Sequence, residues 1–470
     1  MSRLSSWLVV ALLTSGMTAV TTAKSLRHYH AFESGWSWDL AYYNQWYWAL
    51  TQDDGLLSVR PVSSYAQEGP SVWKMNYLAP VRILLIPAYW LVPDPRTLLV
   101  IQNIVFWWVI PAAYTFVRSQ CASERIALSA ATLVPFTPLL WPLVLNDFRE
   151  LQLAIPFVLW TVQGVRERSS GLTAAGIVGM LACRQEFALM VASFAFLSAK
   201  QSEPLSKKLN WRQALLAIGL LWFLFGFFGY LKLTAGSRTP DHFIDQFLGP
   251  RASVGETLAT ALELLAVGLG AWAALALLGP DVGILAIPWI WSLCNGRWAL
   301  RYLSTEEWHH VRYTVPAVAL TLAAGLLGYA RAASWLQSKR GSIALTLLWI
   351  FAAACCGPGL VEVHSRLNRI PHAVSPEEAT ALWYWIHQVD GDEGVVAAYE
   401  ISAPLSSRRE LYSYRLDANK PRGFPQLRPE INWLFIRRGE LDPAPFLDQG
   451  FQPVHSGSSF VVLRRVRDST

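Results

Sequence analysis

Residues 98–117 read LLVIQNIVFWWVIPAAYTFV, a run of twenty residues without a single charged side chain. Arg96 and Arg118 stand just outside its two ends. A membrane-spanning helix needs about 20 mostly apolar residues, because the hydrocarbon core of a bilayer is about 30 Å thick. A helix on the surface of a soluble protein would instead carry charge on one face. The run therefore predicts a transmembrane helix.

The composition of the whole chain agrees with this prediction. Hydrophobic residues make up 53% and charged residues 15% of the 470 residues, against roughly 25% charged residues in an average globular protein. The 23 tryptophans fit the membrane–water interface, where an apolar ring with one N–H is favoured. These figures exclude a disordered, collagen-like or disulfide-scaffold protein. The net charge of +6 comes without a basic run that interleaves aromatics, so no nucleic acid is expected as a partner.

Outward from residues 98–117, the apolar runs predict an all-α polytopic membrane domain of eleven spanning helices. The first run begins shortly after Arg3 and ends in small residues, so a cleaved signal peptide is the alternative for it. The eleven segments are Trp7–Ala23, Leu98–Val117, Ile126–Trp141, Leu151–Val165, Leu172–Cys183, Phe187–Ala199, Ala214–Leu233, Leu258–Leu278, Val282–Leu293, Val315–Tyr329 and Ile343–Ala354.

The apolar segment Leu78–Val92 is short and holds Pro80 and Pro87, which favours an interfacial or re-entrant helix. Charge supports this interpretation. If the segment does not cross, the connections rich in Lys and Arg all face the cytoplasm, as the positive-inside bias requires; if it crosses, they all face outward. The residues placed inside in this way are Arg118, Arg125, Arg166, Arg168, Lys200, Lys207, Lys208, Arg212, Arg331, Lys339 and Arg340.

This topology places residues 24–97, 142–150, 234–257 and 294–314, the turn at 184–186 and the tail on the outer side. We expect a membrane domain over 1–357, with interfacial helices in the loop 24–97, and a small extracytoplasmic α/β domain over 358–470. The tail predicts a helix at Pro376–Val389, strands at Gly394–Tyr399, Glu410–Tyr414 and Asn432–Arg437, a short helix, and a hairpin of Phe451–His455 with Phe460–Arg464.

Acidic residues at the outer helix ends are the first candidates for chemistry. Asp39 follows the first helix within the aromatic stretch Trp36 to Trp48, between Glu33 and Gln45. Partial desolvation by these rings would make a carboxylate a better base, and aromatic faces suit sugars and isoprenoid chains. The alternative is an interfacial aromatic belt around a surface acid.

Three further charged clusters lie at outer helix ends, where ionisable residues are functional candidates. They are Asp147, Arg149 and Glu150; Arg184 and Glu186; and His309, His310 and Arg312. A structural Arg–Glu pair that joins helix ends is the alternative for Arg184 and Glu186. Adjacent histidines point to different faces of a helix, so His309 or His310 with Arg312 suits a phosphate better than a metal.

At these residues the sequence resembles the GT-C class of membrane glycosyltransferases, and within it a prokaryotic branch of predicted membrane proteins of unknown function. The resemblance covers nearly the whole chain. Where that branch often carries His, this sequence has Asn76 and Arg149, which argues against a metal site there. The motifs are Trp38-Asp39-Leu40 with Gln45, Tyr77-Leu-Ala-Pro80 through Pro87-Ala-Tyr89, Asp147-Phe148, Cys183-Arg184-Gln185-Glu186, His310 to Tyr313, and Ala403-Pro-Leu-Ser-Ser-Arg408 with Leu411-Tyr412.

The resemblance implies a glycosyltransferase of the prokaryotic inner or plasma membrane that uses a polyprenyl-phosphate sugar at its outer face and a cell-envelope acceptor. Asp39 would be the base, and Arg184, Arg312 and then Arg149 would stabilise the departing phosphate. No cofactor is required, although a divalent Mg or Mn ion held by Asp147 and Glu150 is one option. The competing interpretations are a transporter or lipid flippase and a membrane scaffold with a degenerate site.

Overall fold

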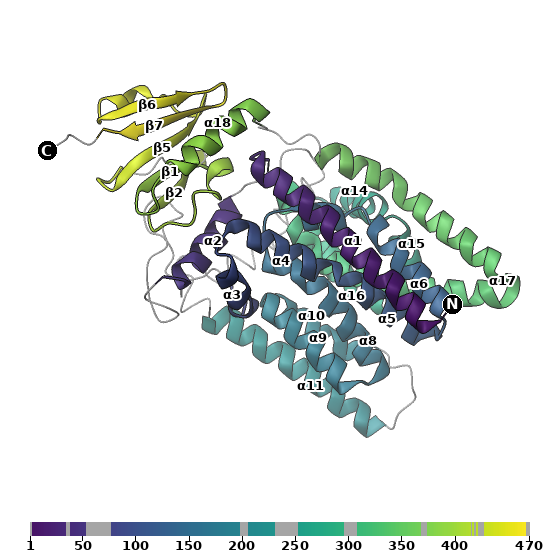
Figure 1. Ribbon diagram of the computed structural model, residues 1–470. Helices are drawn as coiled ribbons and strands as arrows, with labels where there is room; N and C mark the ends of the chain where they lie inside the picture. Colours follow the sequence, from purple (N-terminus) through teal and green to yellow (C-terminus); the bar gives the residue numbers. More distant parts are fainter. Residues whose placement is uncertain are drawn as a thin grey trace.

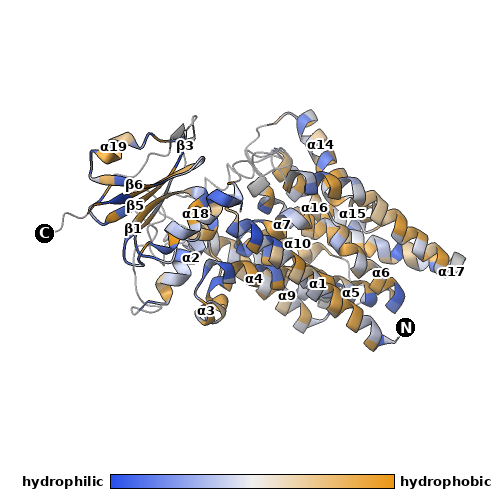
Figure 2. Cartoon of the chain, turned by 45° about the horizontal axis from the view of Figure 1, so that its top comes forward, coloured by the Kyte–Doolittle hydropathy of each residue, from blue (hydrophilic) through white to orange (hydrophobic). Residues whose placement is uncertain are grey.

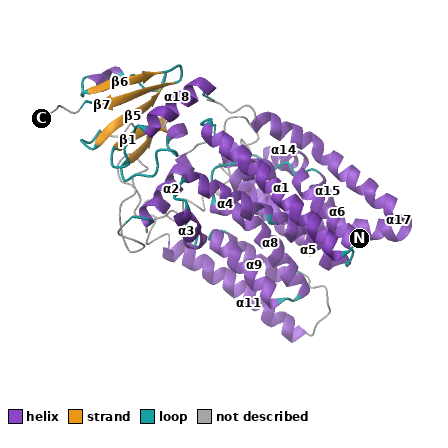
Figure 3. Cartoon of the chain, in the orientation of Figure 1, coloured by secondary structure: helices purple, strands orange, loops and turns teal. Residues whose placement is uncertain are grey.

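A helical bundle carries a small sheet domain at one end (Figure 1). The computed structural model describes residues 2–33, 38–52, 77–197, 205–230, 252–295, 308–367, 374–414, 416–417, 420–421 and 427–466. Figure 3 shows that the described strands lie in the sheet domain and that the bundle is built from helices. The predicted fold class, an all-α membrane domain with a small α/β tail, is confirmed.

The first helix, α1 (Arg3–His30), begins at the Ser2 cap and extends at both ends beyond the predicted span Trp7–Ala23. Its 28 residues measure about 42 Å at 1.5 Å per residue, which exceeds the hydrocarbon core. It packs into the bundle through polar contacts with α4. The Trp107 indole N–H donates to Thr21 Oγ1 at 2.9 Å, and Asn103 Nδ2 donates to Ser25 Oγ at 3.3 Å.

Each of the other predicted spans contains helix in its described part, but several are divided into shorter pieces. Among the described residues, five stretches are long and apolar enough to cross: Arg3–His30, Pro95–Cys121, Asn210–Tyr230, Val311–Ser338 and Gly341–Ser365. The number eleven therefore stays a prediction. The remaining bundle helices are α2 (Trp38–Leu50), α3 (Val81–Leu91), α4 (Pro95–Trp107), α5 (Val109–Cys121), α6 (Glu124–Leu133), α7 (Leu140–Leu145), α8 (Ile155–Glu167), α9 (Ser170–Cys183), α10 (Phe187–Ser193), α11 (Leu205–Leu224), α14 (Val254–Glu263), α15 (Ala271–Ala276), α16 (Pro280–Asn295) and α17 (Val315–Leu367).

The segment that contains α3 is too short to cross a bilayer. Its helix has 11 residues, about 16 Å in length. Ile83 and Leu91 on its outer side are exposed, whereas Arg82, Ile86 and Tyr89 are buried against the rest of the protein. The interfacial position of this helix stays a prediction.

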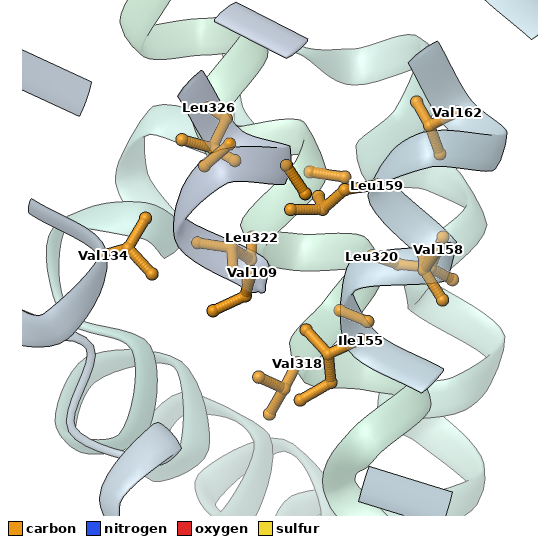
Figure 4. Close-up of a cluster of buried hydrophobic side chains, with 14 of the residues drawn as sticks. Val109, Val134, Ile155, Val158, Leu159, Val162, Val318, Leu320, Leu322 and Leu326 are labelled. Atoms are coloured by element: carbon orange, nitrogen blue, oxygen red, sulfur yellow. The ribbon is translucent and has the colours of Figure 1, made fainter. Parts of the chain in front are cut away.

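The bundle core is built around α5, α8 and α17. Figure 4 shows Val109, Leu159, Leu322 and neighbouring aliphatic side chains meeting there. Helices α8 and α9 approach closely because Gly176 has no side chain: a Cβ at this position would overlap Thr161. Such small-residue contacts are the usual means of close helix packing in membranes. Helix α17 turns back at Gly341, whose φ of 72° favours glycine, and continues to Leu367, past the boundary expected at residue 358.

Charged side chains gather at the two ends of the bundle. At one end Asp281 pairs with Arg166 and with Arg331, and Arg166 Nε also donates to Gln120 Oε1 at 3.2 Å. Arg118, two residues before Gln120, pairs with Glu124. These are arginines that the sequence assigns to one side of the membrane. In Figure 2 hydrophilic residues also gather near the junction with the sheet domain, and apolar residues cover the helices between.

The predicted strands of the tail are present, and each differs from its sequence-based limits by one residue at one end. A five-stranded sheet has the order β2-β1-β5-β7-β6, in which β1 runs parallel to β2 and β5, and β7 runs antiparallel to β5 and β6. Its elements are α18 (Pro376–His387), β1 (Gly394–Ala398), β2 (Leu411–Tyr414), β5 (Ile431–Arg437), α19 (Ala444–Leu447), β6 (Phe451–Ser456) and β7 (Phe460–Arg465), beside a ribbon of β3 (Leu416–Asp417) and β4 (Lys420–Pro421).

The tail is docked on the bundle by α1 and α2. The indole N–H of Trp383 donates to the carbonyl of His30 at 2.8 Å, and its ring stacks on Phe32. Asn44 Nδ2 donates to Ser406 Oγ at 2.8 Å, and Gln45 Nε2 donates to the carbonyl of Arg408 at 3.0 Å. The apolar side chains of α2 and of the sheet share one core.

Candidate functional site

Helix α2 places Asp39 in its first turn and buries it. From Trp38 to Leu50 this stretch forms a helix, and its described rings are enclosed by α3, α4 and the tail rather than arranged as a belt that faces lipid and water. Asp39 is 5% exposed. The alternative of a surface acid within an aromatic belt does not fit this burial.

Two arginines from distant parts of the chain meet the Asp39 carboxylate. Arg312 lies in the 3₁₀ turn η8 (Trp308–Thr314), directly before α17, and its Nη1 donates to Asp39 Oδ2 at 3.0 Å. Arg149 precedes the 3₁₀ turn η3 (Glu150–Ala154), and its Nη2 pairs with the same oxygen. Both of these contacts are made to Oδ2. An acid and two cations are thus assembled at the end of the bundle that bears the tail.

Helix α4 holds the backbone of Arg149 in place. Its backbone N–H donates to Gln102 Oε1 at 2.8 Å, and Gln102 Nε2 donates to the carbonyls of Val144 and Asn146. The guanidinium of Arg149 also lies 5.5 Å from the ring centroid of Tyr43. Gln102 was missed by sequence reasoning, because a single amide within an apolar run gives no signal of its partner.

Arg82 and Glu150 form a buried ion pair beside this site. Arg82 Nη2 lies 2.5 Å from Glu150 Oε1, and the same nitrogen is 3.5 Å from the Tyr43 hydroxyl. Burial opposes ionisation of Glu150, but Arg82 and Arg184 outweigh it and hold the pKa of this carboxyl below its usual range. The two prolines predict an interfacial α3, but no pattern in the sequence pairs Arg82 with Glu150.

Arg184 and Glu186 form the structural pair considered as an alternative from the sequence. Arg184 Nε lies 2.9 Å from Glu186 Oε2, and the guanidinium stacks on Tyr77 at 3.6 Å from the ring centroid. Between them, Gln185 Oε1 accepts from the backbone N–H of Leu78 at 2.6 Å. Arg184 therefore joins the segment before α3 to the α9–α10 turn, and Arg149 replaces it as a cation in contact with Asp39.

The other predicted site residues lie at varied distances from this centre. Gln45 is committed to the tail rather than to Asp39. Glu33 follows α1 and is half-buried, and burial raises its pKa although Arg27 opposes this. Asp147 is buried, and its backbone N–H donates to Asn146 Oδ1 at 2.8 Å. The side chains of His309 and His310, and all of Asn76, lie outside the described residues.

The described carboxylates do not form an evident metal site. No group of three or more His, Cys, Asp or Glu side chains suited to a metal ion occurs within the described part of the chain. Glu150, one of the two residues considered from the sequence, directs Oε1 at the Arg82 cation instead. The donor set at Asp39 likewise consists of a carboxylate and guanidinium groups, which suits an anionic ligand better than a divalent cation. A dependence on Mg or Mn stays a prediction.

Comparison with known proteins finds a family model that matches part of the chain and solved structures that share its fold. Residues 35–244, less than half of the chain, match the family model described as predicted membrane protein, DUF2079. The fold is that of ArnT. The crystal structure of ArnT from Cupriavidus metallidurans bound to undecaprenyl phosphate has a TM-score of 0.54 and 12% identity, and the similarity covers 96% of this chain and 98% of that chain.

Two further solved structures are similar to this chain. The apo structure of the same ArnT gives a TM-score of 0.53 at 11% identity, with the same coverage of both chains. The oligosaccharyltransferase of Archaeoglobus fulgidus, in complex with Zn and sulfate, has a TM-score of 0.44 at 12% identity and covers 84% of this chain and 62% of that chain. No curated protein matches the sequence. The DUF2079 segment includes Asp39 and Arg149, whereas Arg312 and the tail lie beyond it.

Proposed function

We propose that this protein is a membrane glycosyltransferase that takes a sugar from a polyprenyl-phosphate carrier. The observation that carries the proposal is the contact of Asp39 with Arg149 and Arg312 in a protein with the fold of ArnT. A buried carboxylate supplies a proton acceptor, and two guanidinium groups supply the charge complement of a phosphate. ArnT itself has been solved with undecaprenyl phosphate bound, which supports a lipid-linked phosphate as the donor here.

The proposed reaction is a displacement at the anomeric carbon of the sugar. An acceptor hydroxyl attacks this carbon and passes its proton to Asp39. The bond between the anomeric carbon and the phosphate oxygen breaks, and its electron pair stays on the phosphate. Arg149 and Arg312 stabilise the charge that develops there, and stabilisation of this kind is commonly the largest contribution to catalysis. The cell-envelope acceptor and the sugar are left open by this chemistry.

The sidedness of the protein supports a reaction at the outer face. Arg166 and Arg331 lie at the end of the bundle opposite Asp39, since the part of α17 between η8, which holds Arg312, and Arg331 is about 24 Å long. Arginines in short loops favour the cytoplasm. The Asp39 site and the tail then lie outside, in a prokaryotic plasma membrane.

A transporter or lipid flippase is the alternative, and the placement of charge disfavours it. Transporters bind their substrates near the middle of the membrane between broken helices. The described ion pairs within the helical bundle lie at its two ends. A scaffold with a degenerate site would keep the same ion pairs but transfer no sugar.

The test is sugar transfer by the purified protein in proteoliposomes. The probe is undecaprenyl phosphate linked to a radiolabelled sugar, a cell-envelope extract supplies the acceptor hydroxyls, and transfer of label from the lipid fraction to the acceptor fraction is measured. Asp39→Asn keeps the size of the side chain but removes the proton acceptor, so a loss of about 10²- to 10⁴-fold in rate is expected. Asp281→Asn is the matched control, because Asp281 is also a carboxylate shared by two arginines but lies at the opposite end.

Melting temperature is measured on the same samples. Transfer abolished in Asp39→Asn at near-normal melting temperature, with transfer retained in Asp281→Asn, supports the base role. Near-normal transfer by Asp39→Asn contradicts it. Absence of transfer by the wild-type protein with every sugar tested would favour the flippase or scaffold.

A further inference from the structure

Asp39 binds the two guanidinium groups that the proposed phosphate would need. Both guanidinium groups approach one oxygen, Asp39 Oδ2. A guanidinium binds carboxylate and phosphate oxygens through the same N–H donors, in the same plane. A phosphate held by Arg149 and Arg312 would therefore take the donors that Asp39 uses, and the two anions would repel each other at contact distance.

The two arginines are held in place by contacts that do not involve Asp39. Arg149 is tied to Gln102 through its backbone and lies beside the ring of Tyr43. Arg312 is followed at once by α17, and its Nη2 lies 3.5 Å from the Tyr313 hydroxyl. Both guanidinium groups would keep these supports if Asp39 moved away, so they can serve a second anion.

We propose, on the basis of the function proposed above, that Asp39 and the lipid phosphate compete for Arg149 and Arg312. Without lipid, Asp39 neutralises the two arginines. When the phosphate binds, it displaces the carboxylate, which becomes available to accept the proton of the acceptor hydroxyl. The base is thus released only when a donor is in place.

The same exchange accounts for departure of the product. After transfer, Asp39 carries the proton and polyprenyl phosphate remains on the arginines. Loss of this proton to water restores the carboxylate, which competes again for Arg149 and Arg312 and expels the lipid phosphate. Every proton and charge is returned within one cycle.

The competition predicts that loss of the candidate base strengthens lipid binding. Binding of undecaprenyl phosphate is measured with the full-length protein in phosphatidylcholine nanodiscs, with undecaprenol as the uncharged probe. Asp39→Asn should bind undecaprenyl phosphate at least tenfold more tightly than the wild type. Arg149→Gln and Arg312→Gln should each weaken binding at least tenfold, and undecaprenol binding should not respond to these changes.

Asp281→Asn is again the matched control and should bind as the wild type does, because the Asp281 carboxylate lies at the other end of the bundle. Equal or weaker binding of undecaprenyl phosphate by Asp39→Asn overturns the competition. If Asp39→Asn does not fold, Asp39→Ser makes the same test without a charge.

A second measurement uses the wild-type protein alone. Infrared difference spectra with ¹³C-labelled aspartate should show a shifted carboxylate band when undecaprenyl phosphate is added, and no shift with undecaprenol. An unchanged band contradicts displacement of Asp39. If Asp39→Asn loses transfer but binds undecaprenyl phosphate as the wild type does, the competition is refuted and the proposed function is kept. If Asp39→Asn binds more tightly but the wild-type protein transfers no sugar, the competition is kept and the proposed function is refuted.

Discussion

Removal of Arg82 should destabilise the protein strongly, because it leaves Glu150 charged and enclosed. The side chains of this pair are 4% and 0% exposed, so water does not screen them. Arg82 Nη1 also donates to the carbonyl of Tyr77 at 3.3 Å, which ties α3 to the segment before it. Arg82→Met keeps a side chain of similar length but removes both interactions.

The expected cost follows from the burial of the pair. Breaking a buried ion pair by removing one partner typically costs about 3–5 kcal/mol, mostly through the stranded charge. Arg96→Met is a matched control, since the Arg96–Asp94 pair spans 2.7 Å but its side chains are 48% and 26% exposed. An exposed pair contributes about 0–1 kcal/mol. The two variants should therefore differ by about 2 kcal/mol or more.

Unfolding of each variant is measured in the same detergent by chemical denaturation followed through tryptophan fluorescence. The double variant Arg82→Met/Glu150→Gln removes the stranded charge and should recover at least half of the loss. Equal costs for Arg82→Met and Arg96→Met, or no recovery in the double variant, would refute the interpretation of a buried charge pair.

Two further predictions concern the tail and the topology. Glu378 accepts from Ser458 Oγ at 2.6 Å and from the backbone N–H of Ser459 and of Phe460, and these bonds outweigh burial and hold its pKa below the usual range. Its contribution to stability is therefore present above about pH 4.3 and lost as pH falls further. Amide hydrogens of β7 should exchange faster in Glu378→Gln than in the wild type at neutral pH, and this difference should disappear in acid. A difference that does not change with pH contradicts this. In a cysteine-free background, maleimide should label Gly391→Cys in the tail from outside intact cells. It should label Gly171→Cys, at the start of α9, only after lysis; the reverse pattern inverts the topology.

The helices could be predicted from the sequence because long apolar runs are favoured only where lipid or other apolar side chains surround them. Their lengths could not, because hydropathy does not show where the backbone breaks. The predicted span Ile126–Trp141 is divided into α6, a 3₁₀ turn and the start of α7, and Pro135 and Pro138 lie within the division. Proline lacks the N–H that would continue the helix. The tail strands were predicted closely because they are short runs rich in β-branched and aromatic residues that are separated by turn-forming residues.

The site was predicted in its residue types but not in its pairs. Arg184 and Glu186 are two positions apart, so their pairing was an evident alternative, and the structure has it. The pairing of Asp39 with Arg149 and Arg312 joins positions more than a hundred residues apart, and no local pattern in one sequence records such a contact. The packing of the assembled bundle decides which charged residues become buried and which of them pair.

Helix α2 links the tail to the candidate site. Asn44 and Gln45, which bond to the tail, stand five and six residues after Asp39, about 8–9 Å along the helix. The tail loop that they contact is itself fixed by Arg408, whose guanidinium donates to the carbonyls of Leu405, Asp390 and Glu393. Burial lowers the pKa of Arg408 to about 10. Because α2 has only 13 residues, contacts at its middle also set the position of Asp39, so the tail takes part in placing the carboxylate between its two arginines.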